Sequence, residues 1–132
     1  MNIIIAAYSN LNCNSGLHVF HLANKLVERG HDCVVFVPGG KSLTLNNGES
    51  KFITKDFKDI ESIEPLFSDQ AQPDLIHVWT PREVVRRFVE DVLLKKFKCP
   101  YVVHLEDNEE YIFNNNYSAN VSKNIETDFP LH

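Results

Sequence analysis

The sequence predicts an α/β fold, a doubly wound parallel sheet of Rossmann-like type in a single three-layer domain. Short, continuous apolar runs such as "NIIIAAY" (2–8) and "DCVVFVP" (32–38) are typical of strands buried on both faces, as in parallel sheets. Segments whose apolar residues recur at helical spacing alternate with these runs. Right-handed crossovers between successive strands then give five strands in the order 3-2-1-4-5.

The first helix is expected over residues 16–29, directly after the first strand. Ser15 is a plausible N-cap, and Gly30 is expected to end the helix with a positive φ, because only glycine takes that conformation without strain. The apolar face of this helix comprises Phe20, Ala23, Leu26 and Val27. Strand, helix and second strand form one βαβ unit, so the loop at 9–16 lies at the carboxyl edge of the sheet.

The remaining elements follow from the same periodicities. They are an edge strand at 51–55, a weakly amphipathic helix at 57–67, a strand at 75–80, a helix at 82–98 opened by Pro81, and a strand at 100–106. The buried stripe expected on the helix at 82–98 is Val85, Phe88, Val89 and Val92. Residues 1–113 are expected to form the domain, and the Asn-rich stretch 114–132 a tail or linker.

Length and composition bound the class of protein. A chain of 132 residues is sufficient for about one domain, and 43% hydrophobic with 23% charged residues is ordinary for a soluble globular protein. The N-terminal apolar run lacks the basic flank and the length of a signal peptide, so a cytoplasmic location is expected. The three cysteines are widely spaced and include no CxxC pair, which indicates neither a disulfide framework nor a zinc site.

The net charge of -5 arises in one part of the chain. Residues 1–104 carry equal numbers of acidic and basic side chains, whereas 105–132 carry six acidic residues and only Lys123. A neutral globular part argues against nucleic acid as a partner, since nucleic-acid binding needs a basic surface. Arg82, Arg86 and Arg87 gather near the start of one helix. A solvated outer face explains them, and a weak peripheral contact with anionic lipid stays open.

The loop "SNLNCNSGLH" (9–18) follows the central strand, where many α/β proteins bind a phosphate. Its single glycine excludes the G-x-G-x-x-G fingerprint, and no Walker A sequence follows any strand, so no nucleotide cofactor is expected. What remains is the anion-binding capacity of a helix start, with free N–H groups on Gly16, Leu17 and His18. An ordinary capped loop accounts for the same residues equally well.

The histidines supply few candidates for chemistry. His18 and His21 are one helical turn apart but lack a third ligand, so no metal site is expected. His77 lies within an apolar strand, where a hydrogen-bonded core histidine is the favoured interpretation.

His104 ends the fifth strand and is followed at once by Glu106 and Asp107. A histidine beside carboxylates at the ligand edge of a sheet suits positioning of a sugar or acid–base chemistry. The alternative is that these acids solvate a loop and favour the start of a helix.

Three stretches, in this order and spacing, carry a family resemblance: "NSGLHVFHLANKLVERGHDCVVFVP", "PDLIHVWTP" and "CPYVVHLEDNEE". Together they resemble the N-terminal domain of group 1 glycosyltransferases, the family 4 retaining enzymes with the GT-B fold. The match extends to about residue 113. Its most specific elements are "RGH" before the second strand, and an Asp-Leu-Ile-His strand paired with a later strand that ends in histidine.

The resemblance implies a function and a set of site residues. In that family two Rossmann-like domains face each other across a cleft, with the acceptor bound chiefly by the N-terminal domain and the nucleotide-sugar donor by the C-terminal one. Ser15 and Gly16 would approach the acceptor and the donor phosphates, with Leu17 beside them. His104 matches the family histidine that contacts the transferred sugar, and is therefore the candidate catalytic residue.

The chain departs from the family pattern in two places. Its first loop has one glycine where many members have two, and "LEDNEE" follows His104 where many have glycine or aspartate, so Glu106 and Asp107 are substrate-binding candidates by position only. We expect the chain to be the N-terminal half of a retaining hexosyltransferase that is inactive without its C-terminal domain. A stand-alone nucleotide- or sugar-binding module without catalysis is the alternative.

Overall fold

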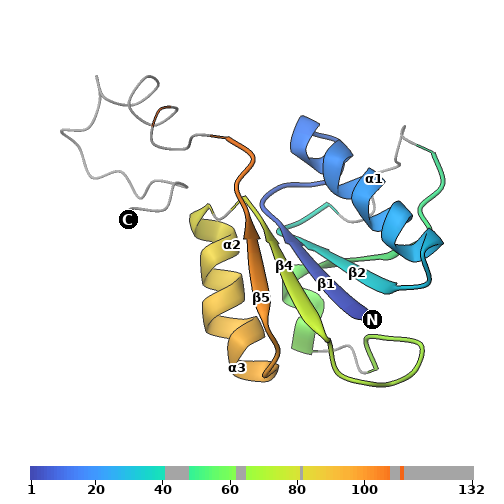
Figure 1. Ribbon diagram of the computed structural model, residues 1–132. Coiled ribbons are helices and arrows are strands. Elements are labelled where there is room, and N and C mark those ends of the chain that lie inside the picture. The colour runs from blue at the N-terminus through green and yellow to red at the C-terminus, as the bar shows by residue number, and fades with distance from the viewer. Residues whose placement is uncertain (41–47, 62–64, 81, 108–110, 112–132) are drawn as a thin grey trace.

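The computed structural model describes residues 1–40, 48–61, 65–80, 82–107 and 111, which fold around a five-stranded parallel sheet (Figure 1). The strand order is β3-β2-β1-β4-β5, so the predicted α/β class and strand order are confirmed. The strands are β1 (Asn2–Ala7), β2 (Asp32–Val37), β3 (Ile53–Asp56), β4 (Leu75–Trp79) and β5 (Tyr101–His104). The helices are α1 (Asn14–Glu28), the 3-10 helix η1 (Phe57–Glu61), α2 (Glu83–Arg87), the π-helix η2 (Phe88–Leu93) and α3 (Leu94–Lys96).

The central strand β1 has all six residues buried, as its apolar run predicts. It pairs in parallel with β2 on one side and with β4 on the other. Because successive side chains point to opposite faces, Ile3, Ile5 and Ala7 enter one core and Ile4 and Ala6 enter the other.

Helices cover both faces of the sheet (Figure 1). On one face α1 contributes Val19, Phe20 and Ala23. The opposite core receives residues of η1, α2 and η2, together with Phe97: Ile60, Val85, Phe88, Val89 and Leu93. The βαβ unit built by β1, α1 and β2 therefore exists as the sequence predicts.

The boundaries of α1 differ from the expected ones at the start and agree at the end. The prediction that Ser15 is the N-cap is wrong, because the helix begins at Asn14 with Cys13 as its cap. Gly30 takes a φ of 82°, and its N–H donates to the carbonyl of Val27 at 2.9 Å, which closes the helix as expected.

The helix after β4 is continuous from Glu83 to Lys96 but contains the π turn η2 in its middle. Leu93 lies four positions after Val89, so it continues the buried stripe of Val85, Phe88 and Val89. Val92 is only partly buried, and Leu93 is fully buried in its place. Pro81, which was expected to open this helix, lies outside the described residues.

The prediction of a single helix over residues 57–67 is wrong. Only Phe57–Glu61 is helical, as a 3-10 helix, and residues 62–64 are outside the described part. The apolar residues Leu66 and Phe67 still reach the core from the connection that follows. The stretch assigned to a tail or linker at 114–132 also lies outside the described residues.

Strand β5 forms the edge of the sheet among the described residues, although its sequence is typical of an interior strand. Tyr101, Val102 and Val103 are 53%, 45% and 46% exposed, and Leu105 just beyond the strand is 70% exposed. In register, β5 pairs only with β4, from Tyr101 opposite Ile76 to His104 opposite Trp79. Three consecutive apolar side chains therefore face solvent on two sides of one strand.

Candidate functional site

The candidate site lies at the carboxyl edge of the sheet, between β1 and β4. The chain leaves β1 toward β2 and leaves β4 toward β5, so the two connections diverge at this point. In open parallel sheets such a switch point leaves a crevice in which ligands bind. The loop after β1, the residues after β4 and the residues after β5 all reach this edge.

The first turn of α1 is closed by Cys13. Its Sγ accepts the N–H of Gly16 at 3.2 Å and donates to the carbonyl of Asn10 at 3.3 Å. The N–H of Leu17 donates to the carbonyl of Cys13 at 2.9 Å. The expectation that the N–H groups of Gly16 and Leu17 are free to hold a phosphate is therefore wrong for this structure, since both already have acceptors.

Gly16 is required here by close packing. A Cβ on this residue would lie 2.4 Å from the carbonyl oxygen of Asn10 and 2.6 Å from the Cα of Leu11. Both are backbone atoms of the preceding loop, which cannot move aside as a flexible side chain would. The absence of a side chain lets α1 begin directly against the loop, and this explains the glycine without any ligand.

Ser15 is buried at this edge of the sheet and connects two other side chains. Its hydroxyl lies 3.1 Å from the hydroxyl of Tyr8 and donates to Oε2 of Glu106. Ser15 and Glu106 are 91 positions apart in the sequence. Two of the residues predicted to bind substrate are thus in direct contact, whereas Asp107 is exposed at the next position.

Glu106 is the centre of this polar cluster. The same Oε2 that accepts from Ser15 lies 3.4 Å from Nε1 of Trp79 and 3.4 Å from Oγ1 of Thr80. The carboxylate is half-buried, and its negative charge lies beside the first turn of α1, where the helix dipole is positive. Glu106 therefore joins α1, β4 and the segment after β5.

Thr80 ends β4 in an unusual backbone conformation. Its φ is 53°, which is rare for a β-branched residue, and only 1% of it is exposed. Its N–H donates to the carbonyl of His104 at 2.9 Å, and its own carbonyl accepts the N–H of Arg82 at 2.8 Å. Strained backbone of this kind is common beside functional sites, where the surrounding structure holds it in place.

Arg82 supplies a positive charge to the same edge. Its guanidinium lies over the ring of Tyr8, 4.0 Å from the ring centre, a cation–π contact. Tyr8, Trp79 and Thr80 were not predicted as site residues. The signal that could have found them is their position, because each ends or follows a strand at the carboxyl edge.

His104 belongs to a group of three rings on the α1 side of the sheet. It is stacked on Trp79, with centroids 3.9 Å apart and planes inclined by 9°. His77 lies 5.5 Å from Trp79 and 5.8 Å from His104 between ring centroids. The pKa of His77 is below its usual value, chiefly because burial disfavours the charged ring and secondly because His104 is close.

His77 was expected to be a hydrogen-bonded core histidine, and the structure instead places it, half-buried, in this ring cluster. His18 and His21 are both exposed on α1. In the described part of the chain, no group of three or more histidine, cysteine or acidic side chains is arranged to hold a metal ion.

Comparison of the chain with protein-family models, curated proteins and solved structures found no match. The described residues include no helix that is long and apolar enough to cross a membrane. The function of the chain must therefore be argued from its own residues.

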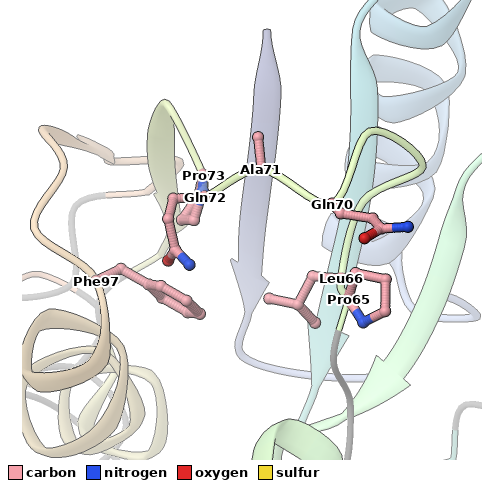
Figure 2. A pocket seen from close by; sticks show the side chains of 7 residues that line it. All are labelled: Pro65, Leu66, Gln70, Ala71, Gln72, Pro73 and Phe97. Atoms are coloured by element: carbon pink, nitrogen blue, oxygen red, sulfur yellow. The ribbon is translucent and has the colours of Figure 1, made fainter.

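A pocket of about 290 Å³ lies at the opposite, amino edge of the sheet (Figure 2). Leu66 and Phe97 face each other across it, and the amide of Gln72 hangs between them. None of the seven lining side chains is titratable. The polar cluster of Ser15, Thr80 and Glu106 lies at the carboxyl edge instead.

Proposed function

We propose that this chain is the acceptor-side N-terminal domain of a retaining glycosyltransferase of GT-B type, with a Rossmann-like fold. The enzyme would move a sugar from a nucleotide-sugar to an acceptor sugar or lipid-linked sugar in the cytoplasm. The donor would be held by a C-terminal domain that closes over the carboxyl edge, and the present chain alone would be inactive. The resemblance of three ordered sequence stretches to that family supplies the reaction type.

The observation that carries the proposal is the position of His104 at the switch-point edge. His104 ends β5 and is stacked on Trp79. Glu106, the centre of the polar cluster, follows two positions later in the chain. A site for a polyhydroxylated ligand commonly combines aromatic rings with a few convergent hydroxyl and carboxylate groups. The ring edge of His104 would contact the transferred sugar.

A measurement of turnover distinguishes the glycosyltransferase proposal from the alternative of a non-catalytic binding module. We would measure nucleotide release from UDP-, GDP- and ADP-sugars with the 132-residue chain and with the full natural reading frame. The proposal expects release only by the longer protein, and its loss in His104→Ala. The control is His31→Ala, since His31 lies between α1 and β2 at the amino edge, away from the site.

Retained activity in His104→Ala, or equal loss in His31→Ala, would remove His104 from the mechanism. Release of nucleotide by the short chain alone would contradict the half-enzyme proposal. Sugar binding without turnover in the longest natural protein would leave the binding module as the function.

A further inference from the structure

The carboxylate of Glu106 lies where α/β proteins with this topology usually bind an anion. The start of the helix after the first strand attracts phosphate because its N–H groups are free and its dipole is positive there. In this chain the N–H groups of Gly16 and Leu17 have internal acceptors on Cys13. The side-chain donors beside them are directed at a carboxylate that the chain itself supplies.

Three donors from separate elements converge on Oε2 of Glu106. Ser15 comes from α1, Trp79 from β4, and Thr80 from the residue after β4. A phosphate approaching this edge would meet a negative charge, and these three side-chain donors are already engaged with it. Asp107 adds a second negative charge at the next position, whereas the cation at this edge, Arg82, is stacked on Tyr8.

A hydroxyl group would meet the opposite conditions. A carboxylate accepts hydrogen bonds from hydroxyl donors strongly, and the contacts of Glu106 with Ser15, Trp79 and Thr80 all end on Oε2, which leaves Oε1 outside this set of contacts in the described part of the chain. The ring of Trp79 is buried, with 5% of the residue exposed, and His104, which is stacked on it, is half-buried, so the exposed part of the His104 ring is the aromatic surface available to a sugar at this edge. Charge and hydrogen-bonding capacity therefore both favour an uncharged polyol.

We propose that Glu106 is a specificity-determining residue that favours an uncharged, hydroxyl-bearing acceptor at the carboxyl edge of the sheet and excludes a phosphorylated one. This inference rests on the proposed function for the identity of the bound molecule as an acceptor. The exclusion of phosphate itself depends only on the residues described above.

The test uses inorganic phosphate as the probe, with amide NMR of the 132-residue chain as the readout. In the native protein, phosphate at tens of millimolar leaves the amides of Ser15 and Gly16 unshifted. Glu106→Gln keeps the size of the side chain and removes its charge, so phosphate then shifts these amides with an affinity about tenfold higher or more. The matched control is Glu49→Gln, which makes the same change at an exposed position ahead of β3, outside the cluster, and leaves phosphate binding unchanged.

Two outcomes overturn the inference. One is saturable phosphate binding at Ser15 and Gly16 in the native chain, a result that needs no variant to fold. The other is an equal gain in Glu106→Gln and Glu49→Gln, which would assign the effect to overall charge. The titration needs no turnover, so its result can be interpreted even if the glycosyltransferase proposal fails. In an active full-length enzyme, Glu106→Gln should also narrow the preference for uncharged over phosphorylated acceptors.

Discussion

The imidazole of His104 lies flat against the indole of Trp79, with ring centroids 3.9 Å apart. The two residues are register partners on neighbouring parallel strands, so the sheet itself fixes their spacing. The same indole offers its N–H to Glu106 at 3.4 Å. Trp79 therefore links the candidate catalytic histidine to the carboxylate at the start of α1.

Trp79 is the single tryptophan of the chain, so its fluorescence reports on this stack directly. The imidazole of His104 covers one face of the indole, so it shields that face from water. We expect His104→Ala to uncover this face and to shift the emission maximum of the folded protein to longer wavelength. His77→Ala serves as the comparison, because its ring is 5.5 Å from the indole and not stacked on it, and it should have the smaller effect. An unchanged emission maximum in folded His104→Ala would contradict the stacked geometry.

The lowered pKa of His77 makes stability depend on pH. Burial is the main cause and the charge of His104 the second, so the folded state binds fewer protons than the unfolded chain does near pH 6.5. The stabilising contribution of the neutral ring is complete above that pH and is lost as the pH falls toward the folded-state pKa. In urea unfolding at a series of pH values, His77→Gln should lose less stability on acidification than the native protein. Parallel pH profiles for the two proteins would show that His77 is not responsible.

Gly16→Ala is expected to destabilise the protein by roughly 1–3 kcal/mol through overpacking against the loop backbone. Helix propensity alone predicts the opposite sign, since alanine in a helix is favoured over glycine by about 1 kcal/mol. Gly39→Ala is the control, because a Cβ there meets nothing within 4 Å, and its effect should stay within about 0.5 kcal/mol. Urea unfolding measures both. A Gly16→Ala protein of unchanged or higher stability would mean that the loop backbone moves to accommodate the added Cβ.

The open edge of β5 should make the isolated chain associate with itself at high concentration. Exposed apolar edge strands offer unpaired backbone groups and apolar surface, and a lysine on the edge suppresses such pairing. Val103→Lys should therefore lower the apparent mass in light scattering without lowering the free energy of unfolding. Ile53→Lys on the opposite edge strand is matched in exposure, at 47% against 46%, and should have the smaller effect. Equal effects would locate the association elsewhere.

The strand order was predictable because apolar runs and crossover rules depend on local pattern and chain handedness. The turn at Gly30 was predictable for the same reason, since its conformation follows from the residue type. The N-cap was not, because Cys13 is a weak capping residue by type and succeeds through its particular contacts with Asn10 and Gly16. The π turn in η2 likewise has no signature in the spacing of apolar residues, and that spacing did not decide between Val92 and Leu93, of which Leu93 is the fully buried one.

The candidate site was predictable only in part. His104, Ser15 and Glu106 were chosen from their places at strand ends, and the structure brings the last two into contact. The contacts that Ser15 and Glu106 make with Tyr8, Thr80 and Trp79 depend on side-chain directions across three strands, which no local pattern specifies. The positive φ of Thr80 is likewise a product of tertiary contacts, because a β-branched residue does not favour it.

The contact between Ser15 and Glu106 joins chain segments 91 positions apart, across β4 and β1. Such a contact can form only after the slow, entropically costly steps of folding, in which distant parallel strands are paired. The cluster is thus a late-forming structure. Glu106, which completes it, follows β5 in the chain and is therefore synthesised after all five strands.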